Sequence, residues 1–248
     1  MSRPPISLQL YTLRDALAQD ELGTLEKVAD LGYEGLECGY PQTPEFIAKC
    51  AELNLAITAC HVGIPALESE LESVIAQNKQ MNNSFIIVPW IGPELRGSAE
   101  NWIALGKRLE IIGAKLKDEG FTLCYHNHDF EFTEQFDGKY GFDLLYENAD
   151  PQYLQVELDT YWVQKGGASP VEYLKKYAGR VPLVHLKDMD AQGNFAEVGT
   201  GSLDWPAIFA ASEAQGVVTY VVEQDVCPGD PFDSIAISME NLRKMGKI

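Results

Sequence analysis

The sequence predicts a single α/β domain over residues 1–248, a (β/α)8 TIM barrel in which strands and helices alternate. Short apolar runs recur along the chain, and a helical segment with an apolar stripe follows each of them. A residue suited to the left-handed cap conformation, usually glycine, ends a helical segment directly before the next run. Polar residues gather at the ends of the runs, where barrel enzymes hold their functional groups.

The predicted strands are short and mostly apolar, as expected for parallel strands covered on both faces. In chain order they are Ile6–Thr12, Gly35–Cys38, Ala56–Val62, Phe85–Trp90, Phe121–His126, Tyr153–Asp159, Val181–Lys187 and Thr219–Glu223.

The predicted helices alternate with these strands. Thr43 is a suitable N-cap for the second helix and Pro44 suits its first helical position, and Gly32, Gly120 and Gly216 follow helical segments as caps. The helical segments are Leu22–Leu31, Thr43–Leu53, Leu67–Met81, Ala99–Glu119, Asp143–Asn148, Pro170–Tyr177, Trp205–Gln215 and Ser234–Met245.

A doubly wound open sheet is the alternative architecture for this alternation. However, the first strand-to-helix turn has no Gly-x-Gly-x-x-Gly pattern, and polar residues stand at nearly every strand end rather than at one crevice. No linker or low-complexity tract interrupts the alternation. The closed barrel is therefore the predicted architecture.

The composition disfavours several functional classes. With 46% hydrophobic residues the chain can bury a large core, yet no apolar run reaches the ~18 residues of a membrane span. A net charge of −18 disfavours nucleic acid as a partner, because polynucleotide binding needs a basic patch. The five cysteines lack metal-knuckle spacing, and the N-terminus lacks a signal-peptide hydrophobic region, so a cytoplasmic setting is expected. A homo-oligomer remains open.

The stretch Leu123–Phe132 carries the densest group of reactive side chains. It begins as an apolar β run and then delivers His126, His128 and Glu131. Residues two apart share one face of a strand, so His126 and His128 are predicted to face the same cavity. All 4 histidines of the chain fall at predicted strand ends. This pattern predicts one wall of a metal-assisted active site.

Side chains from four strand ends are predicted to bind one divalent ion, namely His126, Asp159, His185 and Glu223. Mixed imidazole and carboxylate ligands suit Mn²⁺ or Zn²⁺, with Co²⁺, Fe²⁺ and Mg²⁺ as alternatives. Glu223 follows an apolar Val-Val pair, where an unpaired buried carboxylate would be costly, so a cationic partner is expected. Such an ion would polarise a sugar carbonyl and stabilise an enediolate, which helps to remove the neighbouring proton.

The predicted catalytic residues are Glu157, Lys187 and Glu223. Glu157 shares a strand face with Asp159, one layer deeper, and could be a base, a fourth ligand or a residue that orients a ligand. A salt bridge within the barrel is the structural alternative for it. Lys187 shares a face with His185 and could protonate or hold an oxyanion.

Other strand-end residues are predicted to shape the substrate pocket. His61 is expected to be a pocket wall rather than a ligand, and the tryptophans could stack on a sugar ring or simply pack in the core. These predicted substrate-binding residues are Gln9, Glu37, His61, Trp90, His128, Glu131 and Trp162.

Several of these motifs together resemble the xylose-isomerase-like TIM-barrel superfamily, which includes sugar phosphate isomerases/epimerases, inosose dehydratases and proteins of the AP endonuclease family 2 type. The matching segments are Ser7–Arg14, Tyr125–Phe132, Glu157–Gly167, His185–Asp188, Glu197–Trp205 and Val222–Asp225. The resemblance implies one divalent ion bound by Glu, Asp, His and Glu from four strand ends. The Asp, the His and the second Glu fall on Asp159, His185 and Glu223.

Two positions depart from the pattern that this resemblance implies. The first Glu falls on His126, which puts a symmetric two-glutamate epimerase mechanism in doubt. Trp162 stands where the nuclease members bind metal through His, which argues, together with the acidity, against a DNA repair site.

The favoured function is a metal-dependent sugar isomerase or epimerase that removes a proton next to a sugar carbonyl. The alternative is a lyase or dehydratase that uses the same metal site on a keto-sugar or keto-glycoside and expels an oxygen at the β position. His126 in place of Glu favours the alternative slightly, because imidazole is a suitable acid for a leaving group. A sugar-binding protein without turnover and an endonuclease are further hypotheses.

Overall fold

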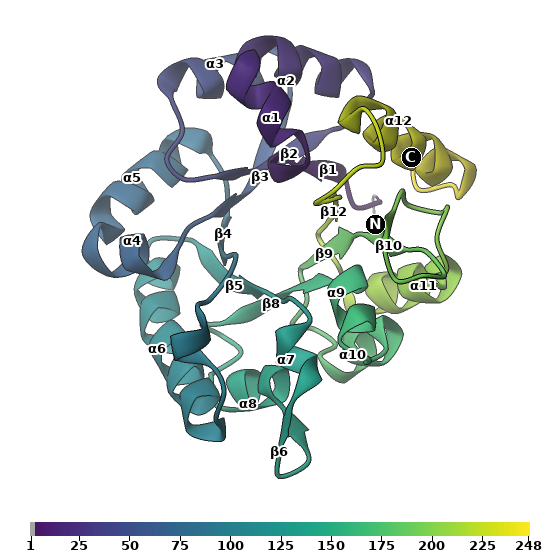
Figure 1. The fold of residues 1–248 in the computed structure, drawn as a ribbon. Coiled ribbons are helices and arrows are strands. Elements are labelled where there is room, and N and C mark those ends of the chain that lie inside the picture. Colours follow the sequence, from purple (N-terminus) through teal and green to yellow (C-terminus); the bar gives the residue numbers. More distant parts are fainter. Residues whose placement is uncertain (1–2) are drawn as a thin grey trace.

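The computed structural model describes residues 3–248, so Met1 and Ser2 of the predicted domain lie outside the described residues. Eight parallel strands close into a barrel in the order β1-β12-β9-β8-β5-β4-β3-β2, with the helices around it (Figure 1), which confirms the predicted fold class. The barrel strands are β1 Ile6–Gln9, β2 Gly35–Gly39, β3 Ala56–His61, β4 Phe85–Val88, β5 Thr122–His126, β8 Gln155–Asp159, β9 Leu183–Leu186 and β12 Thr219–Val222.

The helices cover the outside of the barrel, and each predicted helical segment corresponds to at least one of them. They are α1 Arg14–Gln19, α2 Glu21–Asp30, α3 Pro44–Glu52, α4 Ile64–Ser69, α5 Leu71–Met81, α6 Ala99–Asp118, α7 Phe130–Thr133, α8 Gly141–Glu147, α9 Thr160–Lys165, α10 Pro170–Lys176, α11 Trp205–Gln215 and α12 Pro231–Lys244. Short 3₁₀ helices η1 (Leu10–Leu13) and η2 (Pro93–Leu95) follow β1 and β4.

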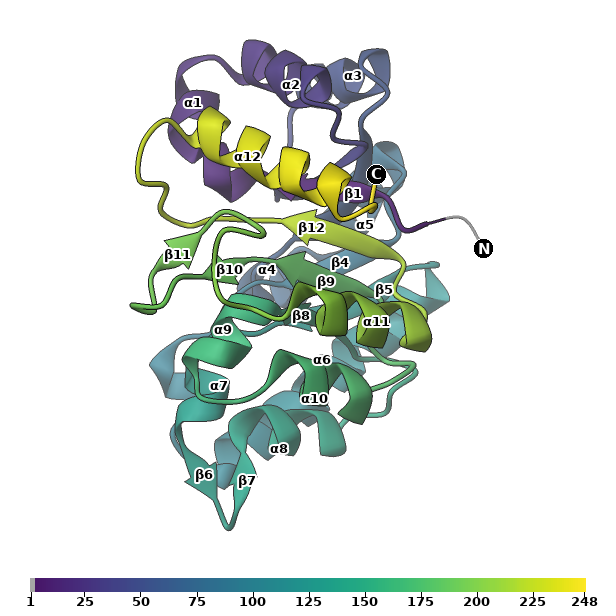
Figure 2. The same ribbon diagram turned by 90° about the vertical axis from the view of Figure 1, so that its right-hand side faces the viewer.

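Two small hairpins extend the loops. They consist of β6 Gln135–Phe136 with β7 Lys139–Tyr140, and of β10 Asp188–Met189 with β11 Phe195–Ala196. In the side view of Figure 2, the β10–β11 hairpin lies at the end of the barrel toward which β12 points. That end carries the site described below.

Five strands end earlier than predicted, β3, β9 and β12 by one residue and β1 and β4 by more, for local reasons. β1 stops at Gln9 because the Gln9 side chain accepts a hydrogen bond of 3.0 Å from the Tyr11 backbone N–H and caps η1. β4 stops at Val88, and the following Pro89 has no N–H with which to extend the pairing. The predicted helix Leu67–Met81 is likewise divided, because Glu70 leaves the helical conformation between α4 and α5.

An apolar layer closes the interior of the barrel. Ala59, Ile87, Cys124 and Leu183 are buried against one another. Residues two positions further along a strand point the same way, so His61, His126 and His185 form the next layer toward the carboxyl ends. The polar site therefore rests on an apolar floor. No helix within residues 3–248 is long and apolar enough to cross a membrane.

Candidate active site

Strand register brings the predicted metal ligands to one level of the barrel. His126 pairs with Glu157 across β5 and β8, and Asp159 pairs with His185 across β8 and β9. Glu223 follows the last residue of β12 and completes the group. All of these side chains are buried.

The ligand atoms of His126, Asp159, His185 and Glu223 lie within 4.8 Å of one another. Asp159 Oδ2 is 3.8 Å from Nε2 of His126 and 4.0 Å from Nδ1 of His185. This buried oxygen also lies 3.1 Å from Nζ of Lys187, although the two atoms are not aligned for a hydrogen bond. Two atoms that are each about 2.1 Å from a shared ion lie at most about 4.2 Å apart, so the distances from Oδ2 to the two imidazoles fit a divalent cation. These four residues are called the ligand set below.

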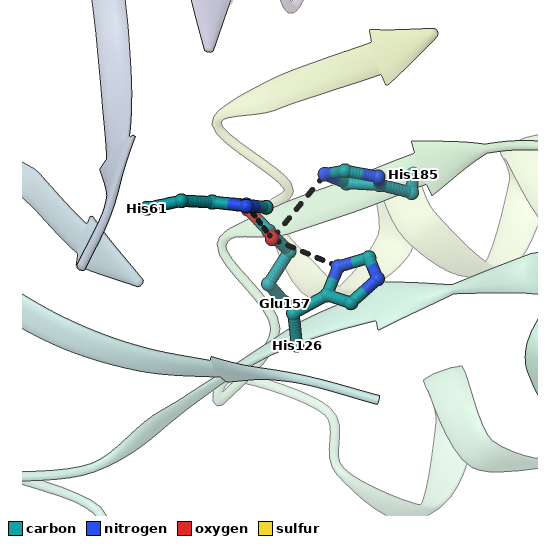
Figure 3. A group of neighbouring side chains, drawn as sticks. All are labelled: His61, His126, Glu157 and His185. Atoms are coloured by element: carbon teal, nitrogen blue, oxygen red, sulfur yellow. Dashed lines mark hydrogen bonds and ion pairs between the residues drawn. The ribbon is translucent and has the colours of Figure 1, made fainter. Parts of the chain in front are cut away.

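A deeper carboxylate, Glu157, lies against three imidazoles (Figure 3). Its Oε2 is 3.0 Å from Nδ1 of His126, 3.2 Å from Nε2 of His185 and 3.3 Å from Nε2 of His61. A carboxylate that accepts the N–H protons of His126 and His185 directs their opposite nitrogens, Nε2 and Nδ1, toward the ligand set, where Nδ1 of His185 lies 3.0 Å from Oε2 of Glu223. Of the roles predicted for Glu157, this geometry favours orienting the ligands.

The same geometry defines a second set of candidate ligand atoms, which lies lower in the barrel. His61, His126, Glu157 and His185 also offer atoms within 4.8 Å of one another. This lower set would use Nδ1 of His126 and Nε2 of His185, the nitrogens that face Glu157. Each imidazole can therefore serve either set through a different nitrogen.

Glu37 and Gln9 extend the network below the ligand set. Glu37 Oε1 lies 2.7 Å from Nε2 of His61, 2.9 Å from Nε2 of His185 and 2.6 Å from Nε2 of Gln9. Burial raises the pKa of Glu37, but His61 and His185 outweigh it and hold that pKa well below its usual range. Burial lowers the pKa of His61, but Glu37 and Glu157 outweigh burial and raise that pKa to about 10. The His61–Glu37 contact is thus an ion pair in the ion-free protein.

Lys187 is buried among carboxylates. Its Nζ lies 3.1 Å from Asp159, 2.7 Å from Glu223 and 2.6 Å from Asp225. Burial lowers the pKa of Lys187, but the three carboxylates raise it above its ordinary value, so the side chain is charged at neutral pH. Burial raises the pKa of Glu223, but Lys187 and His185 outweigh burial and hold that pKa below its ordinary value.

A cavity of about 600 Å³ opens above the ligand set. Of the residues predicted to contact substrate, Gln9, His61, Trp90 and His128 line it, and so do His126, Lys187 and Glu223. Glu37, Glu131 and Trp162 are not among its lining residues, because Glu37 lies beneath Gln9 and His61 and the other two stand behind His128.

The segment after β5 differs from the prediction in one respect. β5 ends at His126, so His128 does not share a strand face with it, although the two ring centroids lie 5.2 Å apart. The His128 ring stacks on Phe130 at 5.4 Å and lies 5.3 Å from Trp162. Burial and Lys187 lower the pKa of His128 to about 3, so its imidazole is neutral at pH 7.

Glu131 supports this turn from behind. Its carboxylate accepts hydrogen bonds from the Tyr125 hydroxyl at 2.5 Å and from the His128 backbone N–H at 2.9 Å, and it is fully buried. Its placement therefore favours positioning His128 over contacting a substrate.

Asp225 was not among the predicted site residues, yet it lines the cavity and pairs with Lys187. Its spacing of two residues from Glu223 was the available signal, since alternate residues share a strand face. The exposed Tyr11 and Arg14 also line the cavity. Tyr11 lies two residues after Gln9 in the predicted strand Ile6–Thr12, so strand alternation was the available signal for it, although the structure places Tyr11 in η1 and Arg14 directly after it.

A family model described as xylose isomerase-like TIM barrel matches residues 25–245. An inosose dehydratase of Clostridium botulinum is 26% identical over 256 residues, covering 84% of this chain and 84% of that protein. An inosose dehydratase of Geobacillus kaustophilus is 24% identical over 279 residues, covering 94% of this chain and 89% of that protein.

Solved structures with the same fold include a sugar phosphate isomerase/epimerase from Parabacteroides distasonis. It has a TM-score of 0.87 at 23% identity and covers 100% of this chain and 96% of that one. The probable 3-DHS dehydratase involved in petrobactin synthesis from Bacillus anthracis has a TM-score of 0.75 at 15% identity. The match covers 96% of this chain and 98% of that one.

Proposed function

Because the chain belongs to the xylose isomerase-like TIM barrel family, and its curated relatives include inosose dehydratases, we propose that it is a divalent-metal-dependent carbon–oxygen lyase. The proposed substrate is a keto-sugar or keto-glycoside. The reaction removes the proton next to the carbonyl and expels water or an alcohol from the β position.

The observation that carries this proposal is the asymmetry of the cavity around the ligand set. Glu223, Lys187 and Asp225 stand together at β9 and β12, with Nζ of Lys187 2.7 Å from Glu223. The opposite side presents His126 and the neutral His128 rather than a second carboxylate. One carboxylate base beside one ammonium acid suits an elimination better than a symmetric pair of bases does.

The ligand set, His126, Asp159, His185 and Glu223, would hold the ion. When bound, a divalent ion supplies Lewis acidity that lowers the pKa of the C–H group next to the substrate carbonyl. Mn²⁺ and Zn²⁺ suit this mixture of nitrogen and oxygen ligands best. Glu157 would keep both imidazoles in the required tautomer.

The chain's own groups can complete the proton transfers. The Glu223 carboxylate would take the proton from carbon, a carbon–carbon double bond would form, and the β carbon–oxygen bond would break. Lys187 would give one N–H proton to the departing oxygen, which leaves as water or an alcohol. Since Nζ is 2.7 Å from Glu223, the proton on Glu223 can then return to Lys187 and restore both groups.

Isomerisation or epimerisation by the same proton removal is the second candidate. His128 favours it, because this side chain lines the cavity and its buried Nδ1 has no hydrogen-bond partner among residues 3–248. It could therefore hold a substrate hydroxyl while the proton returns to carbon.

A screen of keto-sugars and keto-glycosides in deuterated buffer tests both candidates. We expect an unsaturated product that absorbs in the ultraviolet, forms only with metal-loaded protein and disappears after chelation. A re-formed sugar that carries deuterium would instead support the isomerase or epimerase. Ligand binding without metal dependence or turnover would contradict both. The cytoplasmic setting, the lack of nucleic-acid and membrane partners and a homo-oligomeric state stay predictions.

A further inference from the structure

The cavity above the ligand set is larger than the ligand set needs, and its two ends differ in chemistry. One end is formed by His126, His128, Lys187, Glu223 and Asp225, which follow β5, β9 and β12. The second end is formed by residues that follow β1 and β4 or belong to α1 and α3, and it adjoins the first end because β1 pairs with β12. We call this second end the apolar arm, and its residues are Leu10, Tyr11, Leu17, Phe46, Pro89 and Trp90.

Two aromatic side chains of the apolar arm are unusually exposed. Tyr11 and Trp90 each leave 52% of their surface accessible, although both belong to a cavity wall. Large aromatic side chains left exposed at a cavity mark a place where an apolar ligand surface is bound. The arm is continuous with the space above the ligand set, so a single molecule can occupy both ends.

Charges of both signs line the cavity. Arg14 lies 4.5 Å above the Tyr11 ring and donates hydrogen bonds to the backbone oxygens of Tyr11 and Asp225. Lys187 pairs with Glu223 and Asp225 at the first end. Apart from the histidines, Arg14 and Glu21 are the remaining residues of the cavity lining within residues 3–248 that carry a full charge, one of each sign.

Gly39 keeps the entrance of the arm open. A Cβ atom built at this residue, which ends β2 and lines the cavity, meets nothing within 4 Å. The Gly39 backbone is not in the left-handed region, so its conformation does not require glycine. A larger side chain here would narrow the arm without touching the ligand set.

From this arrangement we propose that the substrate is an aryl-substituted glycoside, with its sugar ring at the ligand set and its aromatic group in the apolar arm. This proposal rests on the proposed function, because it assigns the sugar ring to the metal end. The aromatic group contacts Tyr11 and Trp90, and Leu10, Leu17 and Phe46 supply further apolar surface in the same cavity.

Binding of stable glucosides to the metal-loaded protein tests the proposal. The 4-nitrophenyl and methyl glucosides, both anomers of each, are compared by calorimetry. We expect the aryl compound to bind about 4- to 100-fold more tightly, since two aromatic contacts each contribute about 2- to 10-fold. Tyr11→Ala and Trp90→Ala should each lower the affinity for the 4-nitrophenyl glucoside about 2- to 10-fold and leave the affinity for the methyl glucoside unchanged. Gly39→Val should act in the same selective way.

Ile111→Ala is the matched control, because Ile111 is 63% exposed on α6 and does not line the cavity. It should keep the aryl preference. Equal binding of both glucosides, or a preference that survives in Gly39→Val and in the double variant Tyr11→Ala/Trp90→Ala, would overturn the proposal. Metal-dependent elimination from small keto-sugars without aryl preference would overturn this inference alone. Aryl preference without turnover would support it while removing the proposed function.

Discussion

The two halves of the barrel carry different kinds of side chain to the same opening. The ligand half, which comprises the adjacent strands β5, β8, β9 and β12, supplies the whole ligand set and Lys187. The rim half, which comprises β1 to β4, supplies the apolar arm above and the Gln9–Glu37–His61 group below. A closed barrel thus lets one half hold the chemistry while the other shapes what can reach it.

His61 and Glu37 join the halves, with Glu37 2.9 Å from His185 and His61 3.3 Å from Glu157. His61 comes from β3 in the rim half, yet its ring lies 6.2 Å from that of His185 and 5.7 Å from that of His126. Whether the ion uses the ligand set or the lower set depends on this imidazole. The following experiments test whether metal binding and activity depend mainly on the ligand half.

The largest effect is expected from Asp159→Asn in the ligand half. The amide cannot replace the charge of a carboxylate ligand, so bound metal should be lost and turnover should fall at least about 10⁴-fold, the several kcal/mol that a metal ion supplies. Metal analysis and initial rates measure both. A variant that keeps its metal and most of its activity would contradict the ligand set.

Metal affinity should rise steeply with pH. In the ion-free protein, burial raises the pKa of Asp159 to about 6, and Glu157 and Glu37 overcome burial to raise that of His185 well above its ordinary value. Since a raised pKa keeps the proton bound at higher pH, protons compete with the ion. The proton on His185 competes with the ion over the whole range from pH 8 to pH 5. The proton on Asp159 competes as well below pH about 6. Each displaced proton gives about a tenfold change per pH unit, so His185 contributes about 10³-fold between pH 8 and pH 5 and Asp159 adds up to about 10-fold below pH 6.

Competition with a chelating dye at each pH measures this dependence. The slope should steepen below pH about 6, where Asp159 also takes up a proton. A flat profile would show that neither group has to lose a proton when the ion binds.

Glu157→Gln tests the orienting role. The amide keeps the shape but places an N–H donor against imidazole nitrogens that need an acceptor, so metal affinity should fall about 10- to 100-fold. Activity should recover at saturating metal, because Glu157 is buried and does not line the cavity. Activity that stays low in the fully loaded variant would instead make Glu157 a proton-transfer group.

His61→Asn should have the smallest effect on metal binding. If the ion uses the ligand set, affinity should change less than about 3-fold, because His61 reaches that set only through Glu37 and Glu157. Loss of the metal in this variant would assign the ion to the lower set. The matched variant His128→Asn also removes a cavity-lining imidazole, but one that belongs to neither set.

The fold was predictable because its information is local. The glycines after the helices adopt positive φ as expected, for example Gly32 at 91° and Gly120 at 90°, and Thr43 caps α3 by accepting from the Phe46 N–H at 3.1 Å. Strand ends were less predictable, since the Gln9 cap and Pro89 act through side-chain and proline chemistry that apolar runs do not show.

The candidate site was partly predictable. The alternation of strands placed Asp159, His185 and Glu223 on inward faces, and the structure brings them together with His126. The placement of Glu131 required the fold, because the Tyr125 hydroxyl can donate to its carboxylate only once α7 brings Glu131 back to β5. Asp225 and Tyr11 likewise entered the site through loop geometry.

The sequence by itself determined the eight-fold alternation and the kinds of ligand at the strand ends, because caps and strand periodicity depend only on near neighbours. The tertiary structure decided which nitrogen of His126 and of His185 faces Glu157, and which residues form the apolar arm. Those choices depend on distances between residues far apart in the chain, such as Glu37 and His185, and only closure of the barrel sets such distances.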